Sequence, residues 1–194
     1  MSRGTSRQRT PRFAATGRAA FGVVLKGYIE RLRPPGTPVP DRTTVEYLER
    51  IVSRVTDLRR GLDYLETRDD LDMSRVVFYG PSAGAQTGLI LAAVETRYRA
   101  VGMMGAGLVK THALRLPPAN PINMAPHIRA PTLLLQGRYD EDTPLKTHTE
   151  PFFKLLSEPK RLVVYDGGHV APPEIVLTTV GGWLDQILGP VRRQ

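Results

Sequence analysis

The stretch FYGPSAGAQ, residues 78–86, places one serine between two glycines directly behind an apolar run. A strand is predicted to end at Tyr79, and the segment from Ala85 to Glu95 continues with a helical composition. The connection between them must turn sharply, and glycines relieve the crowding there. A G-x-S-x-G pattern between a strand and a helix is typical of a nucleophile elbow, in which Ser82 protrudes above the end of a sheet in a strained conformation.

Two interpretations of Ser82 are open at this point. If Ser82 is a nucleophile, the backbone N–H of the next residue, Ala83, would lie at the positive end of a helix and would face the developing oxyanion. Alternatively, Ser82 caps the helix in an ordinary glycine-bounded loop. A serine hydroxyl is a poor nucleophile without a base, so the first interpretation requires a histidine and a carboxylate elsewhere in the chain.

Short apolar runs on both sides of the elbow predict the fold class. They are rich in β-branched and aromatic residues, and longer segments of helical period separate them. This alternation predicts an α/β protein with a mostly parallel sheet of about five to six strands flanked by helices. The predicted strands are residues 19–25, 75–79, 100–104, 132–136 and 161–165.

Three further helices are predicted from periodicity and from their start signals. Apolar residues recur every three or four positions from Val45 to Leu65, behind a capping box of Thr43 and Glu46. This segment is predicted to be a crossover helix. The other helices are predicted to run from an N-cap at Thr143, with Pro144 next, to about Leu156, and to begin again near Pro173.

A carboxylate and a histidine follow two of the predicted strands. The stretch LLLQGRYDEDTP places Asp140 just beyond one strand, and VVYDGGHVAPP places His169 just beyond the next. The carboxyl ends of parallel strands lie at one edge of a sheet, so Ser82, Asp140 and His169 are expected to converge there. Their order along the chain, Ser, Asp, His, is that of α/β-hydrolases.

Each partner also has a plainer interpretation. Asp140 could be a turn residue, Asp142 competes with it for the same role, and His169 could be an ordinary loop histidine. The joint placement favours the catalytic interpretation. The other three histidines lack such placement and do not have the spacing of metal ligands, so neither a metal nor a cofactor is predicted; they are His112, His127 and His148.

The composition limits the classes of protein to which the chain can belong. It has 194 residues, 41% of them hydrophobic, and no cysteine, which fits one domain without disulfides or a cysteine nucleophile. No apolar stretch approaches the roughly 20 residues of a membrane-spanning helix. We therefore expect a cytoplasmic protein that is not exported and does not bind a membrane.

The positive charge is concentrated at the N-terminus. Five arginines precede the first acidic residue, Glu30, and without them the net charge of +8 falls to +3. Residues 1–18 are predicted to be a basic disordered tail, with a targeting or phosphate-binding arm as the alternative, and residues 19–194 to be the folded domain. Specific nucleic-acid binding is not predicted.

From about Ala20 to Val191 the sequence resembles the α/β-hydrolases, in particular the prolyl-oligopeptidase-like and dienelactone-hydrolase-like serine hydrolases. The resemblance rests on LKGYIER, DLRRGLDYLETRDDLDMSRVVFYGPSAGA, INMAPHIRAPTLLLQGRYDEDTP and GGHVAPPEIVLTTVGGWLDQILGPV. It implies that Ser82, Asp140 and His169 form a catalytic triad. Two departures from the group are Pro81 before the serine and the lack of the first strands with their oxyanion loop, so the domain is expected to be N-terminally truncated.

The expected activity is hydrolysis of short-chain carboxylic esters, with a small-molecule ester as substrate. The alternatives are a serine peptidase of the prolyl-oligopeptidase type and a weakly active or inactive interaction module. Ala83 and Tyr28 are the predicted oxyanion donors, Tyr28 having a packing role as its alternative. Residues 108–131 are a candidate lid. An open sheet edge near Phe21 to Leu25 predicts a homo-oligomer.

Overall fold

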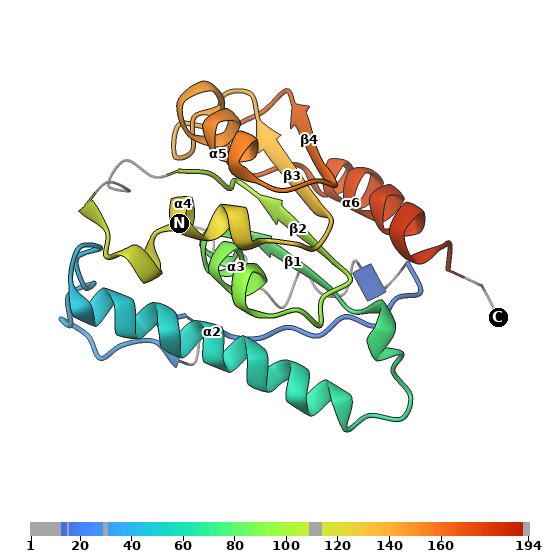
Figure 1. Ribbon diagram of the computed structural model, residues 1–194, viewed down its shortest axis with the longest axis horizontal. Helices are drawn as coiled ribbons and strands as arrows, with labels where there is room; N and C mark the ends of the chain where they lie inside the picture. The colour runs from blue at the N-terminus through green and yellow to red at the C-terminus, as the bar shows by residue number, and fades with distance from the viewer. Residues whose placement is uncertain (1–12, 15, 29–30, 109–113, 192–194) are drawn as a thin grey trace.

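Four parallel strands form the sheet in the computed structural model, which describes residues 13–191 apart from 15, 29–30 and 109–113. Their order in space follows their order in the sequence, and Figure 1 shows the four arrows pointing the same way. The predictions for these four strands are confirmed to within two residues. The strands are β1 (Val77–Pro81), β2 (Ala100–Met104), β3 (Thr132–Gly137) and β4 (Lys160–Tyr165).

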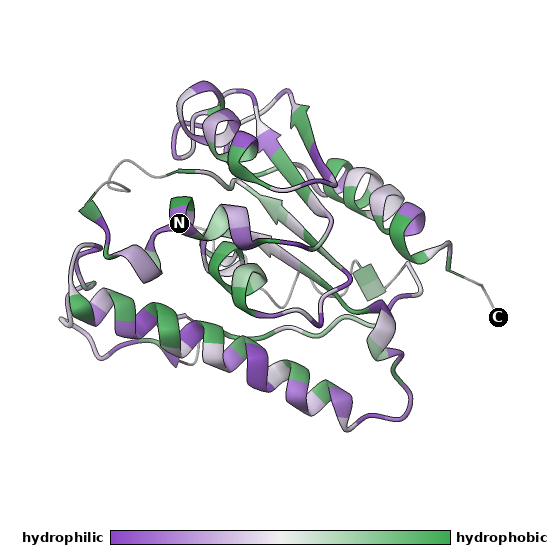
Figure 2. Ribbon diagram, in the orientation of Figure 1, coloured by the Kyte–Doolittle hydropathy of each residue, from purple (hydrophilic) through white to green (hydrophobic). Residues whose placement is uncertain are grey.

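Helices cover both faces of the sheet. Alternate strand residues point to opposite faces, so Val101 and Leu134 belong to the core under α2 and α3, whereas Ala100 and Leu133 belong to the core under α6. Strands β2 and β3 are buried along their whole length, whereas the edge strands β1 and β4 are partly buried. Figure 2 shows that the sheet is mainly hydrophobic. The helices are α2 (Val45–Glu66), α3 (Ala83–Val94), α4 (Pro121–Met124), α5 (Glu150–Leu155) and α6 (Pro173–Leu188).

Two helix starts differ from the prediction. The N-cap of α2 is Thr44, whose hydroxyl accepts from the Tyr47 N–H at 3.3 Å, while Thr43 bonds to Asp41 instead. Beyond β3, a π-helical turn over Leu145–Thr149 precedes α5, so the α-helix begins later than Pro144. The Thr143 N–H donates to Asp140 in the preceding loop, and Thr143 therefore serves that loop and does not cap a helix.

The strand predicted at residues 19–25 is wrong, and the sheet has four strands instead of five or six. This segment packs against helix α2: the ring of Phe21 lies 5.9 Å from that of Tyr64, and Phe21 and Val23 both approach Gly61. These contacts bury the segment only in part, since Phe21 remains 51% exposed, and the segment does not pair with a neighbouring strand. Strand β1 is consequently at the edge of the sheet.

A cavity of about 1860 Å³ lies on the free side of β1. All five residues of β1 line it, residues 19–25 line it as well, and Leu58 and Leu184 contribute from helices α2 and α6. The cavity reaches the elbow, because Ser82 and Ala83 also belong to its wall. The segment 19–25 and strand β1 thus face the same space.

The described part of the predicted N-terminal tail, residues 13–18 without 15, packs onto the domain. The ring of Phe13 lies 5.4 Å from that of Tyr79, and Arg18 forms an ion pair with Asp185 of α6. These residues therefore depart from the predicted disorder, whereas residues 1–12 lie outside the described part of the chain.

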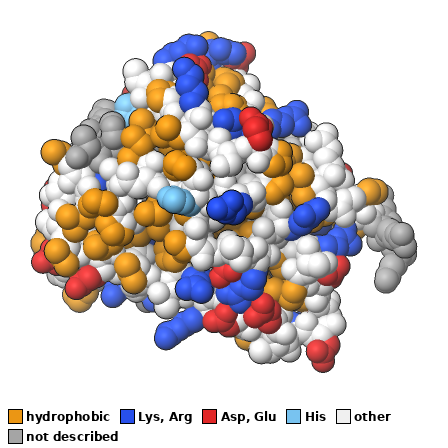
Figure 3. Space-filling model, in the orientation of Figure 1, with side chains coloured by type: hydrophobic (Ala, Val, Ile, Leu, Met, Phe, Trp, Pro, Cys, Tyr) orange, Lys and Arg blue, Asp and Glu red, His pale blue; other side chains and the backbone are white. Residues whose placement is uncertain are grey.

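The surface carries charges of both signs. Lys and Arg side chains lie beside acidic ones over the lower part of the molecule in Figure 3, where α2 runs in Figure 1. Among the helices that the structure describes, none has both the length and the apolar character needed to cross a membrane.

Candidate active site

Ser82 occupies a sharp turn between the last residue of β1 and the first residue of α3. Its φ of 52° is positive, which no other non-glycine residue in the described ranges shows, and a side chain in that region is strained. The Ser82 N–H donates to the Met104 carbonyl at 2.7 Å and ties the turn to β2. A Cβ on Gly80 would lie 2.7 Å from the Gly84 carbonyl carbon, so the turn requires glycine at residue 80.

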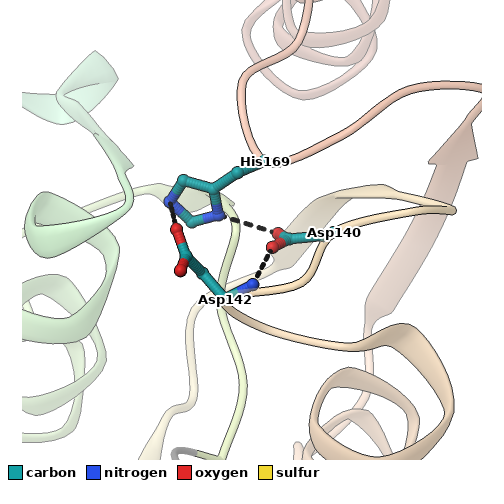
Figure 4. Close-up of side chains that lie close together, drawn as sticks. All are labelled: Asp140, Asp142 and His169. Carbon is teal, nitrogen blue, oxygen red and sulfur yellow. Dashed lines mark hydrogen bonds and ion pairs between the residues drawn. The ribbon is translucent and has the colours of Figure 1, made fainter. Parts of the chain in front are cut away.

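His169 bridges Ser82 and Asp140. Its Nε2 lies 2.7 Å from the Ser82 Oγ, and its Nδ1 lies 2.9 Å from the Asp140 Oδ2. The three side chains follow β1, β3 and β4, so the carboxyl edge of the sheet brings them together. Figure 4 shows the imidazole ring and the carboxylate of Asp140 lying next to each other. This arrangement can pass a proton from a serine hydroxyl to a histidine whose other nitrogen is held by a carboxylate.

The sequence offers two carboxylates as partners of His169, Asp140 and Asp142, and Asp140 is the buried one. Its side chain has no exposed surface, and four donors reach its oxygens. The backbone N–H groups of Asp142 and Thr143 donate to Oδ1 at 2.9 Å each. Gln136 Nε2 and the His169 ring contact Oδ2, also at 2.9 Å each. These four hydrogen bonds fix the orientation of the Asp140 carboxylate.

Gln136 is a member of the site that the sequence analysis missed. It is fully buried, and its Nε2 also donates to the Thr143 carbonyl at 2.8 Å, so it holds both Asp140 and the loop around it. The signal for it was a polar residue at the end of an otherwise apolar strand, TLLLQG.

Asp142 lies on the other side of the imidazole ring. Its Oδ2 is 3.8 Å from His169 Nε2, and its side chain is 78% exposed. Figure 4 shows Asp142 and Asp140 next to different nitrogens of the ring. One ligand atom each from Asp140, Asp142 and His169 lies within 4.8 Å of the others, a spacing that could hold a metal ion. Because Asp140 already accepts four hydrogen bonds, we propose no metal there.

The loop that carries His169 is tied to the end of β3. The Tyr139 N–H donates to the Gly167 carbonyl at 3.0 Å, and the Tyr165 hydroxyl donates to the Gly168 carbonyl at 2.5 Å. Burial raises the pKa of Tyr165, and the charge of Asp140 raises it further, so the hydroxyl remains a donor. These bonds limit the movement of His169 relative to Asp140.

The two predicted oxyanion donors lie in different surroundings. Ala83 is the first residue of α3, next to Ser82. Tyr28 lines the same cavity as Ser82, and its ring packs under the Arg54 guanidinium, with 5.1 Å between the ring centroid and Cζ. The donor role of each stays a prediction.

The candidate lid and the remaining histidines make other contacts in the described part of the chain. The described part of 108–131 forms short helical turns: α4 and the turn after it contact helix α3, and the turn over Pro117–Ala119 contacts helix α2. His148 Nδ1 lies 2.8 Å from the Thr147 hydroxyl. His127 ends a short turn, and His112 lies outside the described residues.

Comparison with known proteins shows similarity in structure only. No protein-family model matches the chain, and no curated protein matches it by sequence. Among solved structures, the esterase domain of a Rhodothermus marinus protein has a TM-score of 0.58 at 19% identity, over 70% of this chain and 69% of that one. The α/β hydrolase GrgF from Penicillium has a TM-score of 0.61 at 14% identity, over 71% of this chain and 72% of that one.

A peptidase is also among the similar structures. A puromycin-hydrolyzing peptidase from Mycobacterium tuberculosis has a TM-score of 0.58 at 20% identity. The match covers 74% of this chain but only 26% of the peptidase. At these identities the similarity establishes the architecture and leaves the activity open. Together with the parallel sheet, the flanking helices and the strained serine turn, it shows that the chain has the α/β-hydrolase fold.

Proposed function

We propose that the protein is a serine hydrolase that cleaves short-chain carboxylic esters. The observation that carries this proposal is the pair of contacts made by His169, 2.7 Å to Ser82 and 2.9 Å to Asp140. A buried, four-fold hydrogen-bonded carboxylate on one nitrogen fixes the ring so that the other nitrogen faces the serine.

The proposed reaction has two stages. Ser82 Oγ attacks the ester carbonyl while His169 Nε2 takes its proton, and the ring then returns that proton to the departing alcohol. The products of this stage are the alcohol and an acyl group bound to Ser82. A water molecule, deprotonated by the same nitrogen, attacks the acyl carbonyl, and the carboxylic acid leaves as the proton returns to Ser82.

The oxyanion of each tetrahedral intermediate would be stabilised by the Ala83 N–H at the N-terminus of α3. The second donor would be Tyr28, which shares the cavity on the free side of β1 with Ser82. One missing donor typically costs about two to three powers of ten in turnover. Because amides need more transition-state stabilisation than esters, a weak oxyanion hole favours an ester substrate.

The described residues of 108–131 are proposed to help select the acyl group. Leu116 and Met124 are half-buried. Met124 ends α4, which contacts α3, and Leu116 precedes the short turn over Pro117–Ala119, which contacts α2. Substituting either by alanine should change the ranking of acyl chain lengths, measured as kcat/KM for a series of p-nitrophenyl esters. An unchanged ranking at unchanged stability would leave the segment as a plain connection.

A direct test compares esters with an amide. The purified protein should hydrolyse p-nitrophenyl acetate and butyrate with burst kinetics and leave amino-acid p-nitroanilides almost untouched. Preferential cleavage of the anilides would favour the peptidase, which the similarity to the mycobacterial peptidase supports. Hydrolysis that persists in Ser82→Ala would contradict the proposed nucleophile.

Self-association through the free edge of β1 is a separate proposal. An edge strand presents unpaired N–H and C=O groups, and pairing with a second copy would cover them. Light scattering after size exclusion should give a mass above the 21.5 kDa of one chain. A strictly monomeric protein across the micromolar range would contradict this proposal.

A further inference from the structure

The imidazole ring of His169 lies directly against the backbone of Gly105, the residue that follows β2. A Cβ added to Gly105 would lie 2.9 Å from the ring Cε1, 3.3 Å from Nδ1 and 3.6 Å from Nε2. Cβ atoms in proteins essentially never have a neighbour within 3.0 Å, so the ring occupies the place that a side chain would need. The φ of Gly105 is +64°, which also favours glycine.

The backbone at Gly105 is held in place by its neighbours. Its N–H donates to the Leu135 carbonyl of β3 at 3.1 Å, and its carbonyl lies 3.4 Å from the Thr143 hydroxyl in the loop of Asp140. A side chain at this position would therefore displace the imidazole ring more readily than the backbone. The ring is the movable partner because it can turn about its own side-chain bonds, whereas the two hydrogen bonds of Gly105 hold the backbone.

We propose that Gly105 is a positioning residue for the proton relay. Because Gly105 has no side chain, the His169 ring can lie against its Cα, in the position between the Ser82 Oγ and the Asp140 Oδ2. This inference rests on the proposed function, because it assigns Gly105 a part in aligning the proposed base. It does not make Gly105 a catalytic residue.

Gly137, at the end of β3, makes room for the backbone of the same loop. A Cβ there would lie 2.1 Å from the Gly168 carbonyl oxygen and 2.7 Å from that of Gly167. The glycines at the ends of β2 and β3 therefore allow the ring of His169 and the backbone of its loop to come close to the sheet. Gly168, the immediate neighbour of His169, differs from both, since no heavy atom lies within 4 Å of its added Cβ.

The test compares Gly105→Ala with Gly168→Ala. Gly168→Ala is the matched control, because it adds the same methyl group next to His169 in open space. Gly102→Ala is a second control, for a buried glycine of β2 whose Cβ would meet Tyr79 and Trp183 instead of His169. For each variant we would measure the melting temperature, the rate of labelling by a fluorophosphonate, kcat and KM for p-nitrophenyl acetate, and the ¹⁵N chemical shifts of the His169 ring.

The Gly105→Ala variant should be labelled about a hundredfold more slowly than the parent, and its kcat should fall by a similar factor, because misplacing a reacting group by about 1 Å has an effect of this size. Its KM should change less than about threefold. Its His169 ring shifts should move as both hydrogen bonds lengthen. Gly168→Ala and Gly102→Ala should stay within about threefold of the parent and keep its ring shifts, whatever their melting temperatures.

Labelling, kcat and ring shifts of Gly105→Ala equal to those of Gly168→Ala would overturn the proposal. A parent protein that is neither labelled nor active would contradict the proposed function alone. The ring shifts of Gly105→Ala would still decide whether Gly105 positions His169, because they report the hydrogen bonds of the imidazole without requiring turnover.

Discussion

The two sides of strand β1 are built differently. Toward β2, all five residues are in register, from Val77 opposite Ala100 to Pro81 opposite Met104, and the Ser82 N–H extends the ladder by one more bond. On the other side, a cavity of about 1860 Å³ lies between β1 and residues 19–25. Ser82 stands where the two sides meet.

This difference separates two requirements of the proposed chemistry. The histidine and the carboxylate of the proposed proton relay come from the paired side, on loops that follow β3 and β4, and four hydrogen bonds hold Asp140. The second oxyanion donor has to come from the open side, where Tyr28 is the candidate. The comparison predicts a correctly aligned nucleophile combined with modest turnover.

The largest effects should come from breaking the paired side. Ser82→Ala and His169→Ala should each lower hydrolysis of p-nitrophenyl acetate by about three or more powers of ten, because the two groups act as one unit. The double variant should be no worse than either single one. A purified Ser82→Ala protein with most of its turnover would show that another residue is the nucleophile.

The next largest effect should distinguish the two carboxylates. Asp140→Asn should lower kcat by about a hundredfold or more, because an amide in place of the buried carboxylate would disturb the orientation of His169. Asp142→Asn, at a 78% exposed side chain, should stay within about fivefold. The reverse ranking would transfer the role to Asp142.

A change on the open side should have a comparable or smaller effect on turnover. Tyr28→Phe keeps the ring under Arg54 and removes only the hydroxyl, so the fold should be unaffected. If the hydroxyl is the second oxyanion donor, kcat should fall by about a hundredfold with KM nearly constant. Turnover equal to that of the parent would leave Tyr28 with its packing role.

The smallest expected effect is on the stability of the protein, through the ion pairs that attach helix α2 to the sheet. Glu95 is buried and accepts from Arg97, which also contacts Asp63 and Glu66 of α2. The hydrogen bond from Arg97 lowers the pKa of Glu95 from 4.5 to about 2. A lowered pKa in the folded state stabilises the protein fully above pH 4.5, and this contribution disappears as the pH falls through about 2.

Glu95→Gln should therefore lower the melting temperature by several degrees at pH 7, and the gap to the parent should narrow steadily between pH 4.5 and pH 3. Circular dichroism at a series of pH values measures it. A gap that is the same at both ends of this range would mean that the ionised carboxylate does not hold α2.

Most of the paired side could be predicted from the sequence because its signals are local. An apolar run followed by a glycine-flanked serine, an aspartate or a histidine identifies a strand end, and parallel strands bring such ends to one edge. The roles of Gln136 and Gly105 could not be predicted in this way. Gln136 does interrupt an apolar strand, but the role of each residue depends on which atoms of distant loops approach it in space.

The open side shows the opposite situation. The run AAFGVVL at 19–25 has the composition of a strand, but a strand also needs a partner with free backbone groups at the right distance. The segment packs partly against α2 and stays unpaired in the described structure. The cap of α2 was likewise predicted one residue too early, at Thr43, because the neighbouring Thr44 is a residue of the same type and is the actual cap.

A fluorophosphonate forms a stable adduct with an activated serine, so it tests most directly whether Ser82 is the nucleophile. Peptide mapping by mass spectrometry should find one adduct per chain, on Ser82, in the folded protein. His169→Ala should slow its formation by about three powers of ten, and unfolding in urea should abolish it. A folded protein that stays unlabelled, or that carries the adduct on another residue, would contradict the account.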